Sequence, residues 1–139
     1  MKEIPEKEKV IRLKLNMPPS VNEYFSITKN GKTGKPGKRV ISEKGKKYKA
    51  YVMKQVTLLV KPEQLFTSKN DRLEMFVHQY PKINNRDIDN IYKCLLDSLT
   101  DAHVWYDDKC VKHLNTWMHK SDKNNGFITI EIKQETEDY

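Results

Sequence analysis

The stretch RDIDNIYKCLLDSLT, residues 86–100, combines a polar entry with the regular apolar spacing of a helix. Apolar side chains recur in it every three or four residues, at Ile88, Ile91, Tyr92, Leu95, Leu96 and Leu99. This spacing predicts an amphipathic helix that packs one face into a core. Asp87 stands where an N-cap or a first-turn acid is favoured. We therefore expect the helix to open at residues 87–90 and to anchor the fold.

Four segments around this helix alternate apolar and polar side chains, as half-buried strands do. They are residues 10–17, 73–77, 110–118 and 127–133. A second helix is expected after Ser42, a favourable N-cap residue, and it should end near residue 60, before Pro62. The turn-forming run at residues 122–126 lies between the last two strands and predicts that they pair as a hairpin.

The resulting order β-α-β-α-β-β predicts one α+β domain over residues 1–139, with the helices packed on a mixed or mostly antiparallel sheet. Residues 28–40 are rich in lysine and glycine and predict a flexible basic loop, and residues 1–8 and 134–139 are expected to be flexible tails. No apolar run is long enough for a membrane span. The lack of a secretory signal and the presence of two cysteines favour the cytoplasm.

Charge is distributed unevenly along the chain. The 26 Lys and Arg residues exceed the 19 Asp and Glu residues, which gives a net charge of +7. Residues 29–54 contain ten basic residues and one acid, whereas residues 84–108 contain six aspartates and two basic residues. A basic surface favours nucleic acid or another anionic partner. The acidic centre within that basic chain is the feature that a function must explain.

The acidic centre contains residue types suited to metal chemistry. Its polar side chains with a possible catalytic role are Asp87, Asp89, Lys93, Asp97, Asp107 and Asp108. Carboxylates suit Mg²⁺, which can activate water and stabilise a leaving oxygen during phosphodiester cleavage. The same spacing also fits purely structural roles: a helix cap, an exposed ion-pair stripe and an ordinary turn. A metal site and a structural role therefore both stay open.

A zinc site is the alternative metal hypothesis. Its ligands would be Cys94, His103, Cys110 and His113. The spacing between Cys110 and His113 is typical of zinc ligands, but Cys94 falls inside the predicted helix without a nearby partner, which favours a core role. The neighbouring pair Trp105–Tyr106 is expected to pack in the core at the helix exit rather than to stack on bases.

Four segments resemble, in order, the RusA family of Holliday-junction resolvases, small endodeoxyribonucleases of bacteria and phages. They are Met17–Asn22, Ile41–Tyr48, Arg86–Lys93 and Leu96–Asp108. The resemblance implies a homodimeric α+β fold that cuts four-way DNA junctions with Mg²⁺, or Mn²⁺, by paired symmetric nicks during recombination and repair. A homodimer also follows from symmetry, because two opposed strands must be cut and this chain has one acidic centre.

The resemblance also implies roles for individual residues. Asp87, Asp89 and Asp108 match the metal-binding carboxylates, and Lys93 matches the active-site lysine. Asp97 and Asp107 would orient these residues without binding the metal themselves. DNA contacts are expected from Asn22, Lys32, Lys35, Lys38, Arg39, Lys46, Lys47 and Arg86. Two alternative functions remain: a nuclease that also cuts flaps and forks, and a DNA-binding recombination accessory protein without catalysis.

Overall fold

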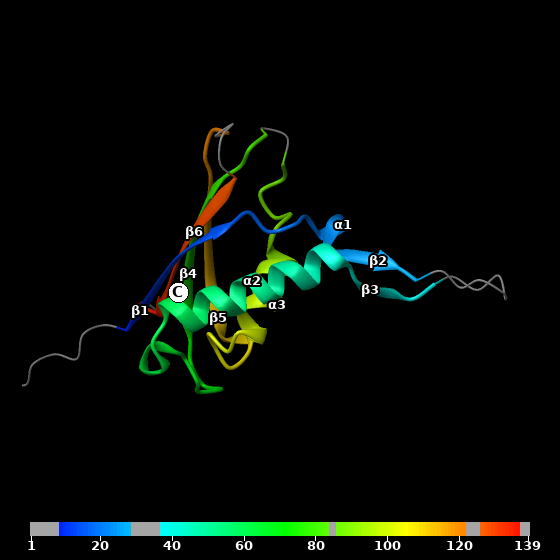
Figure 1. Ribbon diagram of the computed structural model, residues 1–139. Helices are drawn as coiled ribbons and strands as arrows, with labels where there is room; N and C mark the ends of the chain where they lie inside the picture. Colours follow the sequence, from blue (N-terminus) through cyan, green and yellow to red (C-terminus); the bar gives the residue numbers. More distant parts are fainter. Residues whose placement is uncertain (1–8, 29–36, 84–85, 122–125, 137–139) are drawn as a thin grey trace, which may run out of the picture.

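A four-stranded mixed sheet forms the centre of the computed structural model, which describes residues 9–28, 37–83, 86–121 and 126–136. The strand order is β1-β6-β4-β5, with β5 parallel to β4 and the other neighbours antiparallel (Figure 1). The strands are β1 (Val10–Asn16), β4 (Leu73–Tyr80), β5 (Val111–Met118) and β6 (Phe127–Gln134). This arrangement confirms the predicted α+β class and the four predicted strands.

Two helices cover one face of the sheet. They are α2 (Glu43–Leu59) and α3 (Tyr92–Asp101), and α2 crosses the sheet in Figure 1. Their buried side chains, such as Val52 and Leu95, join the inward residues of the strands in a single hydrophobic cluster. Ser42 caps α2 as predicted, with its Oγ accepting a bond from the backbone N–H of Gly45 at 3.1 Å. None of the described helices combines the length and apolar character that a membrane crossing requires.

Three short elements between β1 and α2 were not predicted. Helix α1 (Val21–Tyr24) begins at a capping box formed by Ser20 and Glu23, and β2 (Phe25–Ile27) pairs with β3 (Arg39–Ile41) as a separate ribbon. This ribbon projects away from the sheet (Figure 1). The predicted basic loop at residues 28–40 is therefore wrong at its end, because Arg39 and Val40 belong to β3. Residues 29–36 lie outside the described part of the chain.

The predicted hairpin between β5 and β6 is wrong. β6 lies between β1 and β4, and β5 pairs with the far side of β4. Alternate isoleucines of β6 are fully or almost fully buried, which suits a central strand. In contrast, Leu114 and Trp117 of β5 are both 43% exposed, which suits an edge strand. Turn-forming residues predict a change of chain direction, but they do not determine which strands pair. Residues 122–125 lie outside the described ranges.

The predicted start of the central helix is also wrong. α3 begins at Tyr92, and the preceding residues form a turn in which the backbone N–H of Tyr92 donates to the carbonyl of Asp89 at 3.3 Å. The carbonyl of Ile88, which would accept that bond in a helix, instead accepts one from the side chain of Gln79. Asp87 is therefore not the cap of α3. The predicted stripe retains only Lys93 and Asp97 as helical neighbours.

The predicted tail from residue 134 starts too early. Gln134 belongs to β6, and the backbone N–H of Glu135 donates to the carbonyl of Arg72 at 2.7 Å. The Glu135 carboxylate pairs with the Arg72 guanidinium at 2.9 Å and lies 2.6 Å from Nε2 of His113. Thr136 bonds to the carboxylate of Glu74. These contacts fasten the end of β6 to β4 and β5.

We expect Glu135→Gln to remove a stabilisation that depends on pH. The bonds from Arg72 and His113 lower the pKa of Glu135 below its ordinary value of 4.5. A carboxylate with a lowered pKa in the folded state stabilises the protein above its ordinary pKa, and this contribution is lost as the pH falls through the lower folded value. Urea unfolding should therefore show a less stable variant at neutral pH and a shrinking difference below about pH 4.5. Glu63→Gln, at an exposed acid, is the control, and the same pH profile in both variants would contradict the expectation.

Candidate active site

Asp87 and Asp89 lie on the turn that leads into α3. Both side chains are exposed. Two contacts hold the turn in place: the backbone N–H of Val21 donates to the carbonyl of Asn90 at 2.9 Å, and Nε2 of Gln79 donates to the carbonyl of Ile88 at 2.7 Å. The two carboxylates are therefore presented to solvent on a backbone that is fixed to both α1 and β4.

Gln79 is a buried polar residue that the sequence reasoning missed. Its side chain is completely inaccessible to solvent, and its Nε2 also donates to Oγ1 of Thr116 at 3.2 Å. Buried amides need such partners, so the side chain links β4, β5 and the Asp87–Asn90 turn. The alternation of β4 contained a signal for this role, because Gln79 continues the inward phase of Leu73, Met75 and Val77.

Asp97 lies at the centre of a hydrogen-bonded group on α3. Its Oδ1 is 3.2 Å from Nζ of Lys93, and its Oδ2 accepts a bond from the hydroxyl of Tyr24 at 2.9 Å. Burial raises the pKa of Tyr24 to about 12, so the hydroxyl remains a donor at neutral pH. Asp97 thus links the ammonium group of Lys93 to the hydroxyl of Tyr24 and so orients the Lys93 side chain. No local sequence pattern pointed to Tyr24.

Asp107 is the N-cap of η2 (Asp108–Cys110), the short 3-10 helix before β5, and Asp108 is its first residue. Oδ1 of Asp107 accepts a bond from the backbone N–H of Lys109 at 3.0 Å, and this bond lowers the pKa of Asp107. Burial raises the pKa of Asp108, and the nearby carboxylates of Asp107 and Asp97 raise it further. The positive charge of Lys93 has the opposite effect and lowers the pKa of Asp108. The structure therefore packs α3, with its Lys93–Asp97 pair, against η2, which carries Asp108.

The fit of a metal ion can be judged from these carboxylates. Within the described ranges, no three His, Cys, Asp or Glu side chains form a group that could hold a metal ion. Mg²⁺ commonly needs only one or two protein carboxylates, with water and substrate phosphate as its other ligands. The partly buried Asp108, crowded by like charges, is the type of carboxylate that a cation would stabilise. Asp108 therefore suits a divalent cation that takes its other ligands from water and a substrate phosphate.

The residues of the zinc alternative do not form a site in the described structure. Cys94 and Cys110 are buried, and burial raises the pKa of the Cys94 thiol to about 11, which disfavours the thiolate that zinc requires. His113 is engaged by Glu135, and His103 is exposed at the end of α3. The cysteines are core residues, as the sequence favoured.

A basic groove of about 450 Å³ lies beside the Asp87–Asp89 turn. We call it the α2 groove, and its lining residues include Pro18, Glu23, Lys44, Lys47, Tyr51 and Arg86. Glu23 pairs with Lys44 at 2.9 Å and with Arg86 at 3.7 Å, so this acid fixes two cations along the groove. Bonding to Lys44 lowers the pKa of Glu23, which keeps it charged. Because Arg86 directly precedes Asp87, the groove ends at the first acidic segment.

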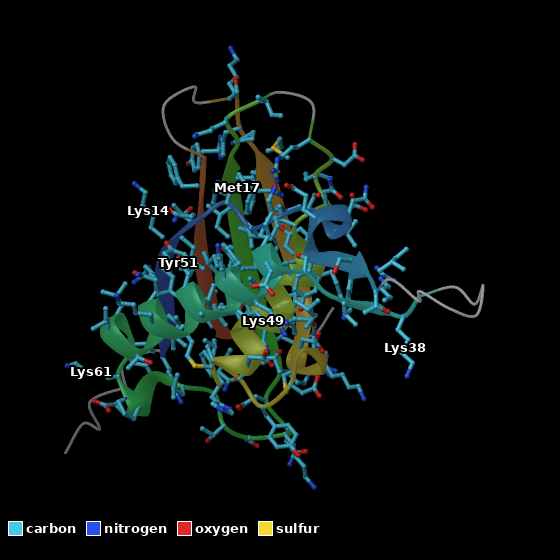
Figure 2. All side chains as sticks on the ribbon, turned by 45° about the vertical axis from the view of Figure 1, so that its right-hand side comes forward. Lys14, Met17, Lys38, Lys49, Tyr51 and Lys61 are labelled. Carbon is cyan, nitrogen blue, oxygen red and sulfur yellow. The ribbon has the colours of Figure 1, made fainter. Side chains whose placement is uncertain are left out.

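The other expected DNA contacts are spread over two regions. Asn22 is exposed on α1, and Lys46 lies on α2, 3.8 Å from Glu43. Lys38 lies on the projecting ribbon with Arg39, as Figure 2 shows for Lys38, and the Arg39 guanidinium stacks 3.6 Å from the ring centre of Phe25. Lys32 and Lys35 are outside the described residues. The structure thus brings Lys47 and Arg86 into one groove, and it does not bring Asn22, Lys38, Arg39 or Lys46 into its lining.

The expectation that Trp105 and Tyr106 both pack in the core is only half confirmed. Trp105 is 2% exposed and belongs to the core, whereas Tyr106 is 61% exposed. Adjacent residues commonly point in opposite directions, so one member of an aromatic pair at a surface turn remains outside. Tyr106 is therefore available for contact with a ligand.

Comparison with known proteins agrees with this arrangement. The chain matches the family of endodeoxyribonuclease RusA over residues 16–133. It is also 35% identical over 95 residues to the crossover junction endodeoxyribonuclease RusA of Enterobacteria phage HK97, a match that covers 68% of this chain and 71% of the phage protein. The range that matches the family includes the α2 groove and both acidic segments. The chain therefore belongs to the RusA family of endodeoxyribonucleases.

Proposed function

We propose that this protein is a metal-dependent endonuclease that resolves four-way DNA junctions in recombination and repair. Family membership supports DNA cleavage, and the name of the phage relative supports the crossover junction as substrate. The observation that carries the proposal is the packing of α3, with its Lys93–Asp97 pair, against η2, which carries Asp108, in a chain of net charge +7. Uncompensated carboxylates would repel DNA, so their presence beside basic grooves favours a bound cation.

Each residue of the centre has a distinct part in this proposal. Asp87, Asp89 and Asp108 would hold Mg²⁺ or Mn²⁺, which when bound polarises the phosphodiester and activates water. Lys93, directed by Asp97, offsets the negative charge that develops on the phosphate. Asp107 orients the start of η2 through its bond to the Lys109 backbone and so positions Asp108.

The proposed reaction requires two copies of the chain. A junction is resolved by nicks in two opposed strands, and two identical centres related by a twofold axis supply symmetric cuts. We infer a homodimer that grips the arms mainly through phosphates, in the cytoplasm of a bacterial or phage-infected cell. Its DNA affinity should fall steeply as the salt concentration rises.

One cleavage assay tests the proposal. The protein is incubated with labelled four-way, flap, fork and linear DNA in Mg²⁺, in Mn²⁺ and in EDTA, and the cuts are mapped on both strands. We expect paired symmetric nicks in the four-way junction only, and only with a metal ion. Cutting of flaps and forks at equal rates would favour the broader branched-DNA nuclease. Binding without metal-dependent cleavage would refute the nuclease function and favour the DNA-binding accessory protein.

A further inference from the structure

A second basic groove, of about 390 Å³, includes Asp107 of the acidic centre in its lining. We call it the Tyr106 groove, and the residues that matter here are Lys69, Arg72, Tyr106, Asp107, Lys109 and Lys112. Two chain segments form its walls, residues 69–72 before β4 and residues 106–112 around η2. Asp107 is part of the wall and Asp108 follows it, so this groove reaches the second acidic segment as the α2 groove reaches the first.

The walls of the Tyr106 groove are fixed to each other. The Cys110 thiol lies 3.9 Å from the carbonyl oxygens of both Ser68 and Lys69, which joins the two segments. Further back, the N–H of Phe66 donates to the carbonyl of Val104 at 2.9 Å. A groove with such walls is preorganised, so a ligand does not have to order it on binding.

The charges of this groove favour an anion. Arg72 is paired with Glu135, and Asp71 accepts bonds from Gln134 and from the backbone of Ser68. The remaining cations, Lys69, Lys109 and Lys112, are exposed and form no ion pair among the described residues. Three lysines of this kind can follow the phosphates of a nucleic acid backbone.

Tyr106 adds a feature that plain phosphate binding does not require. Its ring is 61% exposed, although it follows Val104 and Trp105, which are almost fully buried. Nε1 of Trp105 donates to Oγ1 of Thr100 at 2.7 Å, so the backbone that carries Tyr106 is anchored. An exposed aromatic ring on a rigid support, surrounded by lysines, is the typical arrangement for stacking an unpaired base.

We propose that the Tyr106 groove binds a short single-stranded segment of the DNA substrate next to the scissile phosphate. One unpaired base stacks on Tyr106, and Lys69, Lys109 and Lys112 contact the flanking phosphates. The inference rests on the proposed nuclease function, because it takes the DNA to be cut near Asp108. It adds that the strand is unpaired on this side of the cut, which a branch point permits and a continuous duplex does not.

The proposal is tested by DNA binding in EDTA, with the full-length protein and no cleavage. Tyr106→Ala should bind a four-way junction about 5- to 100-fold more weakly, and Tyr106→Phe should restore the affinity, because the ring and not the hydroxyl stacks. The plot of log affinity against log salt has a negative slope. The triple variant Lys69→Ala, Lys109→Ala, Lys112→Ala should reduce the magnitude of that slope by about 2. The charge-matched control is the triple variant Lys54→Ala, Lys61→Ala, Lys120→Ala, at exposed lysines outside the groove.

A fluorescent base reports the stacking directly. A 2-aminopurine placed in turn at the nucleotides next to the branch point should change its emission when wild-type protein binds, and Tyr106→Ala should abolish the change at one position. An unchanged dissociation constant for Tyr106→Ala, or a salt slope in the groove triple equal to that of the control triple, would overturn the proposal. A reduced salt slope in the groove triple together with normal binding by Tyr106→Ala would also overturn the proposal, because the groove would then contact duplex phosphates only.

These outcomes separate the groove from the proposed function. If wild-type protein cuts junctions and Tyr106→Ala binds them normally, base stacking in the Tyr106 groove is refuted and the proposed nuclease function stands. Wild-type protein that neither binds nor cuts any branched DNA would refute the proposed function itself.

Discussion

Replacing Asp89 by asparagine is expected to abolish junction cleavage while leaving junction binding intact or tighter. The carboxylate is exposed on a turn whose backbone is held by Gln79 and Val21, so the substitution should not disturb the fold. Asparagine keeps the size of the side chain but removes the negative charge that attracts a divalent cation. We expect the cleavage rate to fall on the order of 10²–10³-fold, as when a group that stabilises a transition state is lost.

The binding half of this expectation follows from charge. Removing one carboxylate near the phosphates reduces repulsion, so affinity measured in EDTA should not fall. Asp101→Asn is the matched control, because Asp101 lies at the opposite end of α3, where it pairs with Lys49 at 2.7 Å. The control should cut at nearly the wild-type rate. Normal cleavage by Asp89→Asn would show that the metal assignment is wrong.

Elements with strong local patterns could be predicted from the sequence. β1, β4, β6 and α2 alternate or repeat clearly, and Ser42 is a favourable cap, so their positions agree closely with the structure. Pattern in one segment does not reveal its partner, which is why the β5–β6 pairing was wrong. β6 accepts two neighbours because its isoleucines fill the core centre, a property of the assembled sheet and not of the turn before it.

The start of α3 shows how a distant residue overrides local pattern. Residues 87–91 have the composition of a helix start, yet Gln79 and Val21 bond to their carbonyls and hold a turn. The consequence for the site is direct. In a helix, Asp89 would point along the same stripe as Lys93 and Asp97, whereas in the turn Asp87 and Asp89 face solvent at the end of the α2 groove.

The candidate residues of the site, including the supporting acids Asp97 and Asp107, were readable from their chemistry, but the uncharged supports Tyr24 and Gln79 were not. Asp97 and Asp108 lie eleven positions apart in the chain, and the packing of α3 against η2 brings the segments that carry them into contact. Tyr24, which bonds Asp97, comes from α1, an element that the sequence did not predict. Nothing in the local sequence around Tyr24 indicates its bond to Asp97, so a tertiary contact was needed to find it.

Replacing Trp105 by alanine should have the largest effect on stability. The side chain is buried in the core, its backbone pairs with Phe66, and its Nε1 donates to Thr100. Truncating a buried tryptophan removes apolar burial and leaves a cavity, which lowers the free energy of unfolding by about 3–5 kcal/mol. That is a large share of the roughly 5–15 kcal/mol available to a domain. Urea unfolding followed by circular dichroism measures the loss.

Trp105→Phe separates the two contributions of this side chain, because it keeps an aromatic ring and removes the donor to Thr100. Its loss should be clearly smaller than that of alanine, since a typical hydrogen bond contributes about 1 kcal/mol. Equal stability of wild type and Trp105→Ala would contradict the assigned core position. Trp105 also carries the backbone that leads to Asp107 and Asp108, yet it does not touch the reacting atoms in our proposal. Cleavage by Trp105→Ala should therefore decline with temperature as the folded fraction falls, whereas Asp89→Asn should be inactive at every temperature.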